Sequence, residues 1–123
     1  MNGESPHETA LAVTALGALA HDGRLRAFRL LVRAGSEGMA SGEIARQLGV
    51  APNTLSASLG VLGHAGLVES RREGKSVVYT AAYDRMTGLL AFLMEDCCGG
   101  APEICAPLAG VMQQAACGMA GAS

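Results

Sequence analysis

Three of the four cysteines of this chain lie close together near its C-terminal end, at Cys97, Cys98 and Cys105. Thiolates are soft ligands and prefer soft, thiophilic metal and metalloid ions. The segment 99–102 (Gly-Gly-Ala-Pro) can bend the backbone so that the third sulfur returns to the first two. The spacing therefore predicts a site at which three sulfur atoms bind one ion.

Other uses of these thiols stay open. The Cα atoms of Cys97 and Cys98 are ~3.8 Å apart, shorter than the ~5.5 Å usual in disulfides, so a bond between them would be strained. A disulfide between Cys98 and Cys105 is less strained, and a thiol-redox or persulfide switch is therefore the alternative input. The cysteines could also pack as small apolar residues. We interpret Cys117, alone in an Ala/Gly-rich tail, as a spare thiol.

A second chemical signal lies upstream, where short polar side chains begin a predicted helix near Pro52. Leucines recur at Leu55, Leu59 and Leu62, which places them on one buried face. A helix at Ser41–Leu48, with Ser41 as its expected N-cap and Gly49 as its stop, precedes it after a tight turn. This is helix-turn-helix geometry, in which the start of the second helix enters the DNA major groove. The expected DNA-contacting residues of this helix are Asn53, Thr54, Ser56, Ala57 and Ser58.

A basic hairpin is predicted directly after this helix. The stretches Leu67–Arg72 and Lys75–Thr80 are rich in β-prone residues and flank a tip that contains glycine. They predict a two-stranded β wing. At its tip, Arg71, Arg72 and Lys75 could reach phosphates or the adjacent minor groove.

Further helices are predicted before and after the helix-turn-helix and its hairpin. A helix at Thr9–Ala20 has one apolar face, and a second, capped by Asp22, turns Leu25 and Phe28 inward and ends at Gly35. The arginines of this second helix are most simply a solvated face. A last helix at Ala82–Glu95 carries more apolar surface than a small domain can cover internally. Together, the first and last helices suggest a dimer interface.

Composition sets further limits. The 123 residues suit one domain, and 50% hydrophobic but only 3% aromatic residues favour a mainly α fold. We expect a flexible leader at 1–8, a DNA-binding and dimerisation domain at 9–96, and a C-terminal segment at 97–123 with the cysteine cluster and a flexible tail. The net charge of −2 means that DNA contact must use a local basic patch. No apolar run spans a bilayer and no secretion signal is visible, so we expect a cytoplasmic protein without a membrane partner.

The strings LGALAHDGRLRAFRLLVRAG, SGEIARQLGVAPNTLSASLGVLGHAGLV and ESRREGKSVVYT resemble the ArsR/SmtB family of metal-responsive winged-helix repressors. The resemblance covers roughly Leu16 to Glu95. It implies a homodimeric winged helix-turn-helix protein that binds palindromic operator DNA and weakens or leaves it when an inducer binds. It also implies that the chain is not an enzyme, in line with the lack of a Cys-x-x-Cys motif or a Gly-rich phosphate loop.

Ligand sites differ among members of this family, so each possible ligand residue has to be found in this sequence. The thiolate box on the first reader helix of some relatives is missing, because its cysteine positions hold Ala45 and Gln47. The C-terminal cysteines instead resemble those of an arsenite-responsive branch, which implies As(III) as inducer at Cys97, Cys98 and Cys105, with Sb(III) possible and no organic cofactor. Trivalent arsenic makes three bonds to sulfur, whereas structural zinc needs a fourth ligand. A Zn/Cd sensor is an alternative, and a metal-binding chaperone is a more distant one.

Overall fold

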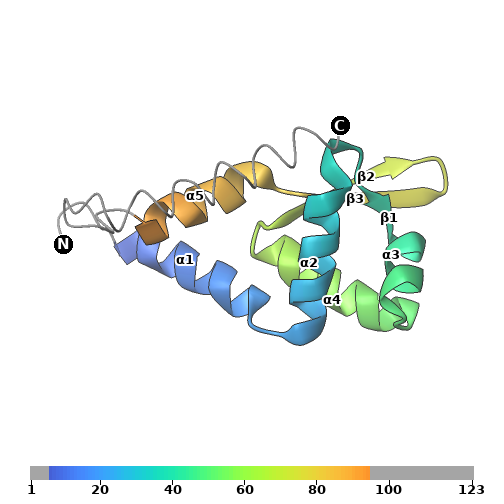
Figure 1. Cartoon of the computed structure of the whole chain (residues 1–123), viewed down its shortest axis with the longest axis horizontal. Helices are drawn as coiled ribbons and strands as arrows, with labels where there is room; N and C mark the ends of the chain where they lie inside the picture. Colours follow the sequence, from blue (N-terminus) through green and yellow to red (C-terminus); the bar gives the residue numbers. More distant parts are fainter. Residues whose placement is uncertain (1–5, 95–123) are drawn as a thin grey trace.

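The computed structural model describes residues 6–94 of the chain, and residues 1–5 and 95–123 lie outside the described part. Helices account for most of it (Figure 1). In chain order the elements are α1 Pro6–Leu19, α2 Asp22–Ala34, the 3-10 turn η1 Gly35–Glu37, β1 Met39–Ala40, α3 Ser41–Leu48, α4 Pro52–His64, β2 Val68–Glu73, β3 Ser76–Ala81 and α5 Tyr83–Met94. Figure 1 shows α1 and α5 together at one end, with the β2–β3 hairpin projecting at the other.

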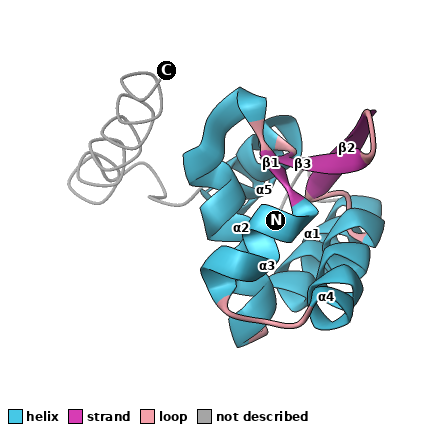
Figure 2. Cartoon of the chain, turned by 90° about the vertical axis from the view of Figure 1, so that its right-hand side faces the viewer, coloured by secondary structure: helices cyan, strands magenta, loops and turns pink. Residues whose placement is uncertain are grey.

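The sheet has three antiparallel strands in the order β1-β3-β2, one more than the predicted two-stranded wing. The added strand β1 has two residues, and Met39 pairs with Tyr79 while Ala40 pairs with Val78. This strand holds the base of the hairpin against the segment that enters α3. Figure 2 shows the small sheet above α3 and α4.

The core forms where α2, α3 and α4 meet the base of the sheet. Leu31 of α2, Ile44 of α3, Leu62 of α4 and Leu67 before β2 are fully buried. The inward positions of Phe28 on α2 and of the α4 leucines are confirmed. Burial of one such side chain stabilises a fold by about 1.5–3 kcal/mol, so this cluster fixes how α3 and α4 meet.

Two local predictions about the first two helices were wrong, namely where the first helix begins and the inward position of Leu25. Helix α1 begins at Pro6, so residues 6–8 of the predicted leader are helical. Its buried face consists of alanines, whereas Leu11 and Leu16 are exposed. On α2, Leu25 is 42% exposed and does not face inward. Small residues allow α1 to pack closely, and this leaves its leucines outside.

Two helix caps also differ from prediction. The N-cap of α2 is His21, not Asp22: its Nδ1 accepts from the backbone N–H groups of Gly23 and Arg24, at 3.1 and 3.3 Å. Ser41 is the first residue of α3, and the cap position is occupied by Ala40, whose side chain makes no capping bond. The Ala40 backbone is committed to β1 pairing, which places the extended cap conformation one residue before the serine.

Candidate nucleic-acid interface

The turn between α3 and α4 is fixed by Gly49, which has a left-handed φ of +68°. Glycine adopts this conformation without the steric cost that a Cβ atom brings. The Val50 N–H donates to the Ala45 carbonyl at 3.1 Å, which closes the end of α3. Pro52 then starts α4 with a φ already suited to a helix. The predicted helix-turn-helix is therefore confirmed.

The N-terminal half of α4 presents its polar side chains outward. Leu55, Leu59 and Leu62 are buried on the opposite face, as the periodicity predicted. The exposed residues are Asn53, Thr54, Ser56 and Ala57, and Ser58 is half-buried. The set predicted to contact DNA therefore lies along one accessible surface, with Ser58 at its edge.

The hairpin is closed by a two-residue turn at Gly74 and Lys75, because Glu73 pairs directly with Ser76. Gly74 has a φ of +63°, which is typical of the tight turns that match strand twist. The side chains of Arg72 and Lys75 are exposed and make no hydrogen bond or ion pair with another residue of 6–94. These two cations are available to an outside partner.

Arg71, the third predicted wing cation, has a different environment. Its Nη2 donates to the Glu37 carbonyl at 2.8 Å, and its Nε donates to the Glu73 carboxylate at 2.5 Å. The side chain therefore braces the hairpin against η1, and its charge is offset by an acid on the same strand. The sequence carried a signal for this pair, since residues two apart on a strand share a face.

The charge of the described part differs from that of the whole chain. All nine Lys and Arg residues lie within 6–94, together with seven of the eleven acidic residues. This part therefore carries a formal charge of +2, whereas the full chain carries −2. The positive charge that would attract the phosphates of DNA is therefore concentrated in residues 6–94.

The predicted ion site lies outside the described residues, because Cys97, Cys98, Cys105 and Cys117 all follow Met94. Within 6–94, no three His, Cys, Asp or Glu side chains are grouped so that they could hold a metal ion. The thiolate site therefore stays a prediction from the sequence.

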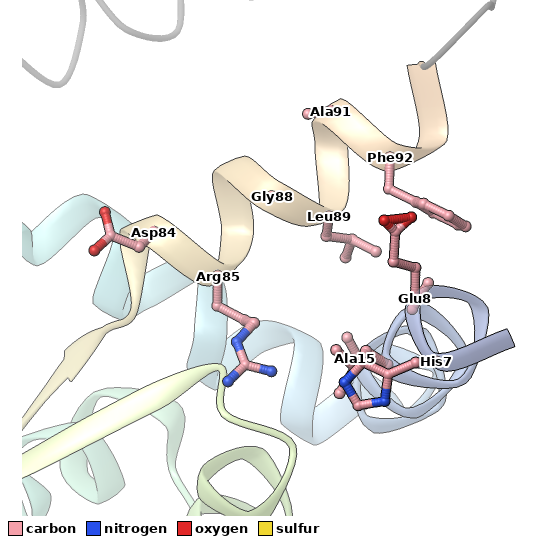
Figure 3. A pocket seen from close by; sticks show the side chains of 11 residues that line it. His7, Glu8, Ala15, Asp84, Arg85, Gly88, Leu89, Ala91 and Phe92 are labelled. Atoms are coloured by element: carbon pink, nitrogen blue, oxygen red, sulfur yellow. The ribbon is translucent and has the colours of Figure 1, made fainter. Parts of the chain in front are cut away.

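The end of the domain opposite the hairpin is apolar and exposed. Helix α5 buries none of its residues fully, although Met86 and Leu89 pack partly against the core. A groove of about 640 Å³ runs between α1 and α5, with Leu89 and Phe92 on one wall and His7 on the other (Figure 3). The exposed large apolar side chains of the two helices are Leu11, Val13, Leu16, Leu90 and Leu93. None of the described helices has the length and apolar character required to cross a bilayer.

Comparison with known proteins agrees with this architecture. A family model described as a helix-turn-helix domain matches residues 19–71. The Biofilm growth-associated repressor of Agrobacterium fabrum is 42% identical over 62 residues, which cover 50% of this chain and 51% of that protein. The chain thus spans about half the length of this curated relative. Its name describes a repressor, which agrees with the expectation that the chain is not an enzyme.

Two solved structures extend the comparison. The homodimeric winged helix-turn-helix DNA-binding domain of Mb0332 from Mycobacterium bovis, a possible ArsR-family transcriptional regulator, is 33% identical and has a TM-score of 0.57. The match covers 78% of this chain and 91% of that one. A protein described as a possible transcriptional regulator for arsenical resistance is 26% identical, with a TM-score of 0.55 and coverage of 64% and 79%. The chain belongs to the ArsR family of winged helix-turn-helix transcriptional regulators.

Proposed function

We propose that the chain is a repressor that binds palindromic double-stranded operator DNA as a homodimer and releases it when As(III) binds. DNA binding is supported by the exposed polar residues at the start of α4 and by the cationic tip of the hairpin. In this family geometry α4 enters the major groove while the hairpin lies over the flanking backbone.

The side chains on α4 have the chemistry for this task. An Asn amide, as at position 53, can make two hydrogen bonds to an adenine edge, and Thr or Ser hydroxyls bond to bases or phosphates. Arg72 and Lys75 would bind phosphates and make the affinity depend on salt. The α4 residues would therefore supply base readout and the hairpin most of the charge.

The homodimer would form through α1 and α5. Their exposed apolar residues make a surface that water disfavours, and exposed patches of this kind commonly mark interfaces. The M. bovis relative, which is described as homodimeric, supports this assignment. Leu93→Glu should yield monomers in analytical ultracentrifugation. Leu25→Glu, at a similarly exposed leucine on α2, should remain dimeric, and the reverse pattern would refute this interface.

As(III), with Sb(III) as a second possibility, would bind to Cys97, Cys98 and Cys105. The support is the match between three clustered thiols and a trivalent ion that makes three bonds to sulfur. The relative described as a possible regulator for arsenical resistance adds to it. A thiol-redox, persulfide or Zn/Cd input is the alternative, and a metal chaperone would bind the ion without DNA.

The ligand would act through the dimer. Cys97 lies three residues beyond the last described residue of α5, so ion capture would bear directly on a helix of the proposed interface. An inducer shifts DNA affinity only by its differential affinity for two dimer geometries. A coupling of about 1–3 kcal/mol would weaken DNA binding roughly 5- to 150-fold.

DNA binding is tested by fluorescence anisotropy on a palindrome from the protein's own promoter. Asn53→Ala should lose about 1–3 kcal/mol of discrimination between this site and a scrambled duplex. Ser36→Ala, at an exposed polar residue of η1 outside the proposed dimer and DNA surfaces, should bind as the wild type does. A wild-type protein that binds no promoter DNA would refute the repressor and favour the chaperone.

The identity of the inducer is tested by titrating reduced protein with arsenite while the free thiols are counted. The proposal predicts one ion per subunit and the loss of three thiols. DNA release on mild oxidation, without arsenite binding, would instead establish the redox alternative.

A further inference from the structure

A groove of about 250 Å³ between α2 and α3 is lined by three arginines, Arg26, Arg29 and Arg33. Spacings of three and four residues place them on one face of α2. Leu30, Gln47 and Leu48 complete the lining, so no acidic side chain contributes to it. One third of the basic residues of the chain therefore meet in one small depression.

These guanidinium groups are poorly compensated. Arg26 lies 3.6 Å from the Asp22 carboxylate, and both side chains are largely exposed. The side chains of Arg29 and Arg33 make no hydrogen bond or ion pair within 6–94. By contrast, Arg24 donates to the Ala18 carbonyl at 2.7 Å. Like charges three and four residues apart destabilise a helix, so the arginines of the groove favour an anion between them.

The α3 side of the groove adds no competing charge. Glu43 bonds to Arg46, and its carboxylate also accepts from the Gln47 amide at 2.8 Å. This acid is therefore already engaged by its own helix. Gln47 and Leu48 are uncharged, so the three arginines of α2 determine the charge of the groove.

We propose that this groove binds phosphate groups through Arg29 and Arg33, with Arg26 assisting. The guanidinium fork matches the oxygens of a phosphate and binds them with charge-assisted hydrogen bonds. The volume lies below the ~300–1,000 Å³ of sites that enclose whole drug-sized ligands. A phosphate or a short run of phosphates fits it better than a bulky organic anion.

Two sources could supply the phosphate. Gln47 and Leu48 form the last turn of α3, directly before the turn at 49–51 that leads to the DNA-facing start of α4. A DNA phosphate bound in the groove would extend the DNA-contacting surface beyond α4. This possibility rests on the proposed function. A free polyphosphate or phosphate ester would bind independently of DNA.

The first arm of the test uses DNA-free full-length protein and inorganic tripolyphosphate in isothermal titration calorimetry. Arg29→Gln with Arg33→Gln should weaken binding about tenfold, because two solvent-exposed ion pairs with the phosphates are lost. The matched control is Arg85→Gln, which removes an exposed arginine of α5 outside the groove and should leave tripolyphosphate binding unchanged. Circular dichroism checks that each variant is folded.

The second arm measures operator affinity against salt concentration. If DNA supplies the phosphates, the double variant should lower the slope of log K against log salt by about 3.6 for the dimer, because each of its two subunits loses two contacts at ~0.9 per contact. A lower slope assigns the phosphate to DNA, whereas weakened tripolyphosphate binding alone assigns it to a free anion. If the double variant changes neither measurement, or if Arg85→Gln weakens tripolyphosphate binding as much, the proposal is overturned. Failure of the wild type to bind DNA would refute the proposed function, and the first arm would still decide this inference.

Discussion

Gly38→Ala is expected to destabilise the protein by about 2–6 kcal/mol. Gly38 has a φ of +73° and a ψ of −163°, a conformation that is open essentially to glycine and costs other residues about 1–3 kcal/mol. A Cβ atom there would also lie 2.4 Å from the Tyr79 carbonyl oxygen and 2.6 Å from Cγ2 of Thr80. The oxygen is backbone and cannot rotate away, so β1 must shift from β3, at a further cost of about 1–3 kcal/mol.

Gly35 provides a matched control three residues earlier. Its φ of +76° and ψ of −161° are nearly the same, but a Cβ atom there would meet nothing within 4 Å. Gly35→Ala should therefore pay only the backbone cost, and Gly38→Ala should be less stable by about 1–3 kcal/mol. Urea unfolding at one protein concentration measures both. Equal free energies of unfolding would refute the claim that close contact with β3 governs this position.

Three further predictions concern α2, α5 and the hairpin. His21→Ala should lower the free energy of unfolding by about 1 kcal/mol in urea unfolding, and His21→Asn, which also caps, should restore most of it. Burial raises the pKa of Tyr83 above its ordinary value of 10.0. Because the unfolded chain then loses this proton first, stability should fall as the pH rises through that value, and Tyr83→Phe should show a smaller fall between pH ~8 and ~11. Arg72→Gln with Lys75→Gln should lower the salt slope of operator binding by about 3.6 for the dimer, because each subunit loses two cations, and an unchanged slope would exclude both residues from phosphate contact.

The reader helices could be predicted from the sequence because their signals are local. The leucines of α4 recur with the helical period, Pro52 suits a first turn, and Gly49 suits a left-handed stop. These residues place the polar surface of α4 without knowledge of any distant contact. The same holds for the hairpin, whose β-prone runs flank Gly74.

The features that the sequence did not predict depend on contacts between distant segments. Strand β1 is two residues long, too short to show alternation, and it exists through its pairing with β3. Arg71 bonds to the carbonyl of Glu37, 34 positions earlier in the chain. Local propensity cannot resolve such choices, since tertiary pairing decides them.

The most direct test of the whole account is operator affinity of the reduced full-length protein with and without arsenite. We expect tight binding without the ion and a roughly 5- to 150-fold loss when it is added. Cys105→Ser should bind the operator equally well and no longer release it. Unchanged wild-type affinity in arsenite, or undiminished release by the Cys105→Ser protein, would contradict the account.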